Sequence, residues 1–333
     1  MALDCPLASN PQPDDPLAEQ PGPPDRQREL RIRAAWIYHV EGRTQNEVAQ
    51  ALGLNRVAVT RLLSEARRRG EVSVRIDAEL GNIVALERRL ERRYRLDRVL
   101  VAPWRNAEES PNSVIASVAG PFVSRLIRDK TTVGVGWGRT LHAMLPHLVG
   151  RPIEDLRVVS LLGGISEAKR FNPAEFAWQF AERFEAEGFL VPAPALVDSP
   201  QTKHALLERC GLDQVFQMAE TSDVALLSCG GIDTLTTSFR MGHVNEAERQ
   251  SLVASGAVGD ILYTFVDVEG RVVDHSINTR AMAMPLDRFQ RVTTRVLISG
   301  GVEKRAIMRA ALKCLRPSIL ITDELTAEWL TAA

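Results

Sequence analysis

The sequence predicts an α/β protein with two parts: an N-terminal winged helix-turn-helix domain and a mainly parallel sheet covered by helices. Three observations support this prediction. The chain has 333 residues, of which 45% are hydrophobic and 25% charged, as in an ordinary water-soluble protein of two domains. Residues 44–69 show the pattern of two short helices followed by three arginines. From residue 97 onward, apolar strand-like segments alternate with amphipathic helical ones.

Residues 1–25 differ from the rest of the chain. They contain seven prolines and five acidic residues but no Lys or Arg. We expect this tail to be disordered, because it has too little apolar surface to bury. A basic segment followed by an apolar run is missing, so no signal peptide is expected. No segment approaches 18 uninterrupted apolar residues, so the sequence predicts no membrane span.

The four cysteines, Cys5, Cys210, Cys229 and Cys314, are scattered along the chain without the spacing of metal ligands. We therefore expect reduced thiols, no metal site, no cofactor and a cytoplasmic protein.

The first predicted domain, the winged helix-turn-helix, spans residues 26–78. A supporting helix over residues 30–41 is expected to turn Ile32, Ala35, Trp36 and Val40 inward. Two shorter helices follow it and form the helix-turn-helix.

The ends of these two helices can be placed from the sequence. Thr44 is expected to cap the first one, with Glu47 three residues later completing a capping box. Gly53 should end that helix, because glycine adopts a left-handed φ without strain. Asn55 is a candidate cap for the second helix. The predicted buried faces are Val48, Ala49 and Leu52 in the first helix, and Val59, Leu62, Leu63 and Ala66 in the second.

The outward side chains suit DNA recognition. Arginine can bind guanine or phosphate, asparagine can bind adenine, and small hydroxyl side chains suit either bases or the backbone. The candidate DNA-binding residues are Gln45, Asn55, Arg56, Thr60, Arg61, Ser64, Arg67 and Arg68. An ordinary helical hairpin with solvated arginines is the alternative. Charge favours the first interpretation: residues 26–95 carry 16 basic and 9 acidic residues (+7), whereas the remainder carries 25 and 33 (−8).

Two further elements are predicted before the sheet begins. The alternation of Val72, Val74 and Ile76 suggests a short strand of a wing. Residues 79–96 are expected to form a linker helix. Its apolar stripe, Ile83, Leu86 and Leu90, could pair with a second subunit.

Residues 97–333 are predicted to form the sheet domain. Strands are expected at 98–101, 131–135, 157–162, 189–191, 224–228, 261–267, 295–299 and 319–322. Helices are expected at 114–127, 141–149, 172–187, 203–210, 245–255 and 304–312. Such alternation predicts ligand binding at the carboxyl ends of the strands, where the strand order reverses.

Four glycine-containing loops follow predicted strands: residues 134–138, 163–164, 230–231 and 300–301. The first continues into Arg139 and Thr140 at a helix start, and Lys304 follows the last. Backbone N–H groups, cations and a hydroxyl in such loops suit a phosphate or polyol. Tight turn geometry is the alternative for any single loop. None of them matches the dinucleotide or P-loop spacing.

Several blocks together resemble the SorC family of sugar-responsive bacterial transcriptional regulators. They are RTQNEVAQALGLNRVAVTRLLSEARRRG, GVGWGRTL, LLGGI, GDILYTFVDVEGRVVDHSINTRAM, VLISGGVEKRAIMRAAL and ITDELTAEWL. The resemblance covers residues 28–330. It implies a winged helix-turn-helix joined to an effector domain related to sugar-phosphate isomerases and deaminases. It also implies homodimers or homotetramers that bind double-stranded operator DNA and respond to phosphorylated sugars or polyols.

The resemblance also implies effector-binding residues. They are Gly136, Trp137, Gly138, Arg139, Thr140, Gly163, Gly164, Gly230, Asp260, Asp267, Arg280, Gly300 and Lys304. Asp260 and Asp267 would accept hydrogen bonds from sugar hydroxyls, while structural roles in turns remain open for both. Trp137 could stack on the ligand or fill the core.

Two functions therefore remain to be compared. The favoured one is a regulator, not an enzyme, whose operator binding depends on a small carbohydrate. The alternative is a sugar-phosphate isomerase-like or deaminase-like enzyme with an accessory nucleic-acid-binding domain. The sequence offers no pairing of acid and base that would identify a catalytic site.

Overall fold

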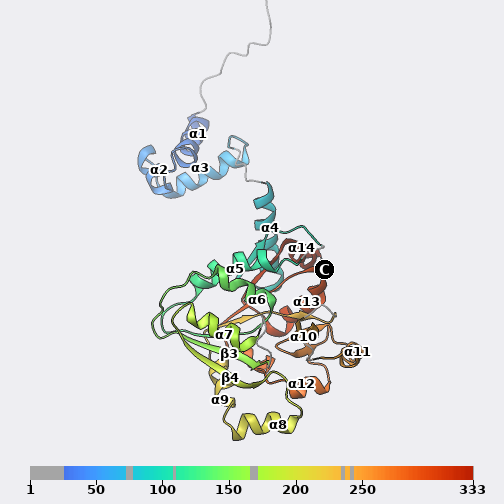
Figure 1. Cartoon of the computed structure of the whole chain (residues 1–333). Coiled ribbons are helices and arrows are strands. Elements are labelled where there is room, and N and C mark those ends of the chain that lie inside the picture. The colour runs from blue at the N-terminus through green and yellow to red at the C-terminus, as the bar shows by residue number, and fades with distance from the viewer. Residues whose placement is uncertain are drawn as a thin grey trace, which may run out of the picture. The chain divides into compact units, whose positions relative to one another are not determined.

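The computed structural model describes residues 26–72, 78–107, 110–165, 172–233, 237–240 and 244–332. The chain divides into two compact units, residues 1–77 and 78–333 (Figure 1). The predicted disordered tail and most of the predicted wing, including Val74 and Ile76, lie outside the described residues.

The first unit contains the three expected helices, α1 (Arg26–His39), α2 (Gln45–Leu52) and α3 (Arg56–Arg68). The capping box of α2 is present, because the Thr44 N–H donates to the Glu47 carboxylate at 2.7 Å and the Thr44 hydroxyl accepts the Glu47 N–H. Gly53 ends α2 with a φ of +64°. Asn55 caps α3 by accepting the Ala58 N–H at 2.8 Å. The predicted helix caps at Thr44 and Asn55 and the predicted helix end at Gly53 are therefore confirmed.

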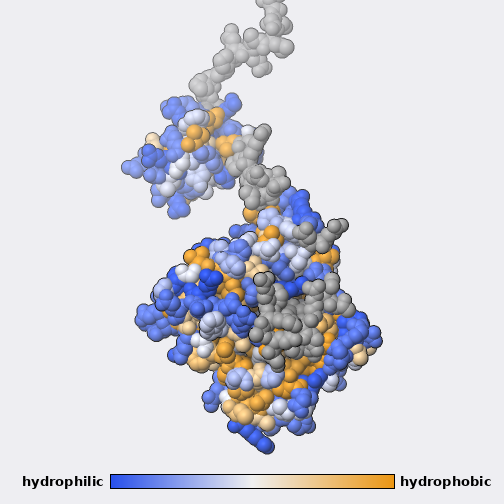
Figure 2. Space-filling model, in the orientation of Figure 1, coloured by the Kyte–Doolittle hydropathy of each residue, from blue (hydrophilic) through white to orange (hydrophobic). Residues whose placement is uncertain are grey.

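The inward face of α1 was predicted wrongly, except for Ala35, which is buried as expected. Ile32, Trp36 and Val40 are exposed (44%, 59% and 61%), whereas Arg31 is 3% exposed. Ala34 and Ala35 are also buried. Arg31 faces inward because its guanidinium donates two hydrogen bonds of 2.7 Å to Glu71, and this pairing allows a charge to be buried. Figure 2 shows the first unit as mainly hydrophilic with small apolar patches.

The second unit contains a seven-stranded sheet in the order β1-β10-β9-β5-β2-β3-β4, in which every neighbouring pair is parallel. The strands are β1 (Arg98–Ala102), β2 (Thr132–Val135), β3 (Arg157–Gly164), β4 (Glu187–Pro194), β5 (Val224–Leu227), β9 (Thr294–Ile298) and β10 (Ile319–Asp323). The strand order reverses between β2 and β5, since β3 and β4 lie on one side of β2 and the later strands on the other.

Helices cover both faces of this sheet, as the sequence predicts. One face packs against α5 (Asn112–Leu126), α6 (Arg139–Met144) and α7 (Pro173–Glu182). The other packs against α4 (Ala78–Tyr94), α9 (Asp213–Glu220), α13 (Arg305–Leu315) and α14 (Glu324–Ala332). Successive strand residues alternate between the two cores: Leu226 belongs to the first and Leu227 to the second. The remaining helices are α8 (Pro200–His204), α10 (Thr237–Arg240), α11 (Glu246–Ala254) and α12 (Ser276–Arg280).

The predicted linker helix corresponds to α4, and this helix packs within the second unit. Ile83, Leu86 and Leu90 are buried in the same core as β1 and α14, so the stripe is not available to pair with a second subunit, the possibility raised by the sequence. Two carboxylates of α4 also cover the exposed edge of β1. Glu87 accepts the Val101 N–H at 2.9 Å, and Glu91 accepts the Val99 N–H at 3.2 Å.

This edge contact predicts a measurable stability effect. Replacement Glu87→Ala leaves the Val101 N–H without its acceptor, so we expect a loss of about 1–3 kcal/mol in the free energy of unfolding. Glu87→Gln retains an acceptor oxygen and should lose less. Urea unfolding followed by tryptophan fluorescence measures both variants, and equal stability of Glu87→Ala and wild type would contradict this role.

The predicted strand over residues 261–267 is wrong. The chain instead forms an antiparallel hairpin of β7 (Gly259–Ile261) and β8 (Thr264–Val266), next to β6 (Gly230–Gly231). Leu262 and Tyr263 make the turn with φ values of +54° and +61°. Residues as bulky as leucine and tyrosine rarely adopt a positive φ in a two-residue turn. Burial of both side chains offsets the resulting backbone strain.

Other differences concern helix lengths. The helix predicted over residues 172–187 ends at Glu182, because Glu187 already begins β4. Four α-helices of the described residues, α9, α10, α12 and α14, were not predicted. Within the described residues, no helix is long and apolar enough to cross a membrane.

Candidate functional site

The outer surface of α3 carries most of the predicted DNA-binding side chains. Asn55, Arg56, Thr60, Arg61, Ser64, Arg67 and Arg68 are all exposed, and Gln45 at the start of α2 is partly exposed. The opposite face of α3 is buried through Val59, Leu63 and Ala66. This division fixes which side of α3 faces solvent, and it makes the polar surface available to a partner.

Some of these side chains already have partners within the unit. The Thr60 hydroxyl lies 3.1 Å from the Gln45 side-chain oxygen and 3.0 Å from the Arg56 carbonyl. Asn55 uses its side-chain oxygen as the α3 cap, so pairing to adenine through both polar atoms would require that oxygen to be shared. In the part of the chain that the structure describes, Arg56, Arg61 and Arg67 form no ion pair.

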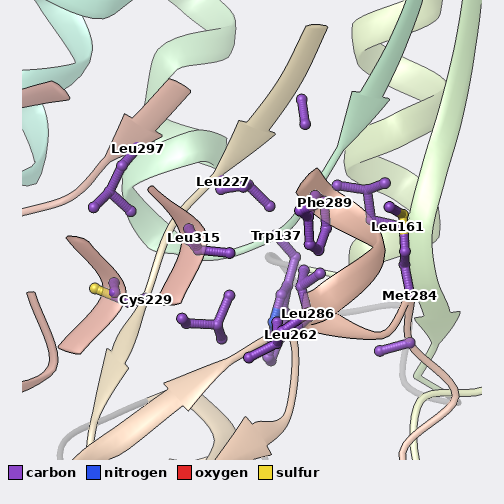
Figure 3. Close-up of a cluster of buried hydrophobic side chains, with 14 of the residues drawn as sticks. Trp137, Leu161, Leu227, Cys229, Leu262, Met284, Leu286, Phe289, Leu297 and Leu315 are labelled. Atoms are coloured by element: carbon purple, nitrogen blue, oxygen red, sulfur yellow. The ribbon is translucent and has the colours of Figure 1, made fainter. Parts of the chain in front are cut away.

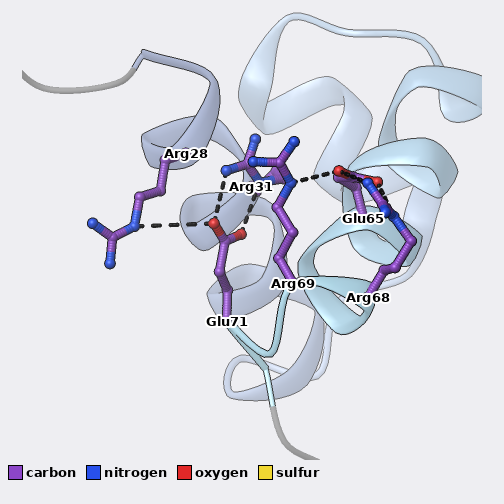
Figure 4. A network of polar contacts seen from close by, with 6 residues as sticks. All are labelled: Arg28, Arg31, Glu65, Arg68, Arg69 and Glu71. Atoms are coloured by element: carbon purple, nitrogen blue, oxygen red, sulfur yellow. Dashed lines mark hydrogen bonds and ion pairs between the residues drawn. The ribbon is translucent and has the colours of Figure 1, made fainter.

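Arg68 is held differently. Arg68 and Arg69 both donate to Glu65, and Figure 4 shows the three side chains together. These hydrogen bonds lower the pKa of Glu65 to about 2, so its carboxylate stays ionised. Contact of Arg68 with a phosphate would therefore require it to leave or share Glu65.

The second unit has a pocket at the carboxyl ends of β2, β5 and β9. Trp137, Gly138 and Arg139 follow β2, Ser228, Cys229 and Gly230 follow β5, and Lys304 follows β9; Ser238, Asp260 and Leu262 complete its lining. β2 and β5 are the neighbours between which the strand order reverses, the usual ligand position in such sheets. The cavity itself is small, about 30 Å³, within about 420 Å³ of space that includes open solvent.

Two cations give this pocket its positive charge. Arg139 is partly exposed, whereas Lys304 is 6% exposed. Burial lowers the pKa of Lys304, because the charged ammonium loses hydration there. α6 has only six residues, so we assign the attraction for an anion to these two cations rather than to the helix dipole.

Asp260 supplies the acidic group of the pocket. Its carboxylate accepts the Tyr263 N–H at 3.0 Å in the β7–β8 turn, and the residue is 4% exposed. Burial raises the pKa of Asp260 to about 7, although the Tyr263 N–H and Lys304 act in the opposite direction. Asp260 therefore both stabilises the β7–β8 turn and lines the pocket.

Trp137 also has both of the roles considered from the sequence. Its ring stacks on Tyr263 with a centroid distance of 4.9 Å and an interplanar angle of 17°, and it also lines the pocket. Figure 3 shows Trp137 among Leu262, Leu286 and Phe289 in the hydrophobic core. The pocket wall is therefore continuous with the core below it.

Comparisons with known proteins identify the family. The sequence model of the family described as "Putative sugar-binding domain" matches residues 78–332. The erythritol catabolism regulatory protein EryD of Brucella abortus (strain 2308) is 32% identical over 306 residues, which cover 91% of this chain and 96% of EryD. The full-length sorbitol operon regulator SorC from Klebsiella pneumoniae has a crystal structure that matches with a TM-score of 0.69 at 25% identity, covering 91% and 99% of the two chains. This chain belongs to the SorC family of sugar-binding transcriptional regulators.

Other SorC-family relatives carry related names. The deoxyribonucleoside regulator of Bacillus subtilis (strain 168) is 28% identical over 307 residues, or 91% of this chain and 97% of its own length. EryD, SorC and this third relative are thus all named as regulatory proteins.

The structure brings six of the predicted effector-binding residues together in this SorC-family pocket: Trp137, Gly138, Arg139, Gly230, Asp260 and Lys304. The other predicted residues do not line it. They are Gly136, Thr140, Gly163, Gly164, Asp267, Arg280 and Gly300.

Each of these residues has contacts elsewhere in the second unit. The Gly136 N–H donates to the Leu226 carbonyl, and the Thr140 hydroxyl donates to Asn112 at 2.8 Å. Asp267 accepts two backbone N–H groups of its own turn and pairs with Arg271.

The remaining four residues serve the fold in the same way. Arg280 pairs with Glu248 at 3.1 Å. Gly163 lies against the carbonyls of Ala193 and Pro194 on β4, Gly164 lies beside Ala174 and Asn172, and Gly300 lies against Asp323. These four residues have contacts within the fold, and their role in effector binding stays a prediction.

Four lining residues were not selected from the sequence: Ser228, Cys229, Ser238 and Leu262. Ser228 and Cys229 stand directly before Gly230, so the strand-end rule could have found them. Leu262 depends on the hairpin turn, which was not predicted. Burial raises the pKa of Cys229 to about 11, so this thiol stays protonated. Among the described residues, no group of three His, Cys, Asp or Glu side chains could hold a metal ion.

Proposed function

We propose that this chain is a DNA-binding transcriptional regulator of a carbohydrate catabolism operon, and that a small phosphorylated sugar or polyol controls its operator binding. The observation that carries the proposal is the joining of two features in one chain: an exposed basic recognition helix and a pocket with two cations and one carboxylate at the switch point of the sheet.

The pocket chemistry supports a ligand with both an anionic and a hydroxylated end. Arg139 and Lys304 can bind phosphate oxygens by charge-assisted hydrogen bonds. Asp260 can accept hydrogen bonds from hydroxyl groups when it is ionised. The names of EryD and SorC, which refer to erythritol catabolism and the sorbitol operon, agree with a polyhydroxylated ligand.

The proposed mechanism follows from linkage. If the effector and DNA prefer different conformations of the protein, each changes the affinity of the other by the same factor, typically 5-fold to 150-fold. We expect this to occur in a homodimer or homotetramer, because helix-turn-helix proteins commonly read two half-sites.

A binding experiment tests the proposal. A duplex selected from a random library by the full-length chain serves as the operator, and its affinity is measured with erythritol, sorbitol, deoxyribose 5-phosphate and fructose 6-phosphate. We expect at least one compound to shift the affinity without being consumed. Turnover of a sugar phosphate, with no effect on DNA binding, would support the enzyme alternative instead.

Asp260 makes the polyol contact pH-dependent. Because its pKa in the free protein is about 7, the carboxylate is mostly protonated at pH 6 and mostly ionised at pH 8. We expect affinity for erythritol, which does not itself titrate there, to rise about tenfold between these pH values. Calorimetry of wild type and Asp260→Asn measures the effect, and the variant should lack the rise. A rise that persists in the variant would remove Asp260 from the contact.

The same pKa affects folding. It is raised above the value of about 3.8 for an unperturbed Asp, so the folded state binds more protons than the unfolded state between pH 4 and pH 7. The contribution of Asp260 to stability is therefore present at low pH and is lost as pH rises through about 7.

A further inference from the structure

One buried carboxylate joins the Lys304 turn to the beginning of α14. Asp323, which is 1% exposed, accepts the Gly301 N–H at 2.8 Å and the Thr326 hydroxyl at 2.7 Å through one oxygen. Its other oxygen accepts the Thr326 N–H at 2.9 Å. The Gly301 N–H also lies 3.0 Å from the Thr326 hydroxyl oxygen. Asp323 thus accepts hydrogen bonds both from Gly301, in the turn after β9, and from Thr326, in α14.

The fit between these segments leaves little room for independent movement. A Cβ at Gly300 would lie 2.0 Å from the Asp323 carboxylate, so only glycine fits there. Gly301 has a φ of +109°, which also favours glycine. The turn then closes when the Lys304 N–H donates to the Gly301 carbonyl at 3.0 Å. A displacement of Lys304 would therefore act through Gly301 on Asp323 and Thr326.

From α14 the contact continues to α4. Leu330 of α14 is buried in the same core as Leu86 and Leu90 of α4, and the Tyr94 hydroxyl donates to the Leu330 carbonyl at 3.1 Å. α4 begins at Ala78, directly after Asp77, the last residue of the first unit. The packed path thus runs from a pocket residue to the helix that joins the second unit to the first along the chain.

We propose that Asp323 and Thr326 are positioning residues that couple Lys304 to α4, so that occupancy of the pocket alters the helix leading to the DNA-binding unit. This rests on the proposed function for its ligand, but the coupling itself is a property of the ligand-free chain. Both residues act through hydrogen bonds, without contacting the ligand.

Amide hydrogen exchange on the full-length, ligand-free chain tests the coupling. We expect Asp323→Asn and Thr326→Val to speed exchange at least fivefold in residues 300–304 and in α4. Thr326→Ser keeps the hydroxyl and should restore wild-type exchange. Asp267→Asn is the matched control, since Asp267 also accepts turn N–H groups, yet it has no contact with this cluster.

Two outcomes would overturn the proposal. In one, exchange accelerates in residues 300–304 while α4 keeps its wild-type rate. In the other, α7, which covers the opposite sheet face, accelerates as much as α4; the cluster would then support stability in general.

A second measurement separates this inference from the proposed function. In wild type, we expect 20 mM inorganic phosphate to slow exchange in residues 300–304 and to change exchange in α4; in Thr326→Val only the first effect should remain. A retained α4 response in Thr326→Val would overturn the coupling. Failure of phosphate to protect residues 300–304 in wild type would count against the phosphate pocket, while the ligand-free comparison would still decide the coupling.

Discussion

Replacement of Lys304 by methionine should abolish the response of DNA binding to a phosphorylated effector while leaving DNA binding itself intact. The ammonium is one of two cations in the pocket, and a hydrogen bond between charged groups contributes about 1.5–3 kcal/mol, or roughly 10-fold to 150-fold in affinity. Methionine has a similar length, so the pocket wall is retained. Calorimetry of the effector and titration of the operator measure the two effects separately.

The fold should tolerate this change. Because burial lowers the pKa of Lys304, its charge destabilises the folded state near neutral pH, and methionine removes that cost. Lys203→Met is the matched control, since burial also lowers the pKa of Lys203, which does not line the pocket. A normal effector response in Lys304→Met, or an equal loss in Lys203→Met, would exclude Lys304 from ligand binding.

Replacement Arg61→Ala should weaken specific DNA binding by about 1–3 kcal/mol if the guanidinium contacts a base. Arg61 is exposed on α3 and forms no ion pair among the described residues, so its removal disturbs no contact within the unit that the structure describes. Competition between the selected duplex and unrelated DNA, at one fixed salt concentration, separates specific from non-specific binding.

Arg33→Ala provides the control for this experiment. Arg33 is an exposed arginine of the same unit, but it lies on α1 and pairs with Glu29. The two variants have the same net charge, so a difference between them reports position rather than charge. Equal affinities of Arg61→Ala and Arg33→Ala for the selected duplex would reject base contact by Arg61.

The sequence predicted those features that depend on neighbouring residues. The caps at Thr44 and Asn55 and the turn at Gly53 are local, and the apolar strands of the parallel sheet are recognisable without knowledge of their neighbours. The errors occurred where a distant partner decides the outcome. Arg31 faces inward because of Glu71, forty residues away, and the hairpin turn at Leu262 is supported by burial rather than by turn-forming residues.

The same distinction applies to the pocket. Strand-end loops could be named from the sequence, but which loops converge depends on the strand order, which placed β5 between β2 and β9. Gly163 and Gly164 are the last residues of β3, on the side of β2 away from β5, and they do not line the pocket. Asp267 and Arg280 were drawn from a family resemblance, and in this chain each has a charged partner nearby.

The two outer strands of the sheet limit how copies of this chain can associate. The N–H groups of Val99 and Val101 on the free side of β1 are already bound to Glu91 and Glu87, and β4 on the opposite side contains Pro192 and Pro194, which have no N–H to donate. Strand addition that would merge two sheets into one is therefore disfavoured at both borders. Subunits that assemble through this unit are expected to meet through helices and loops, where side chains decide which partner is accepted.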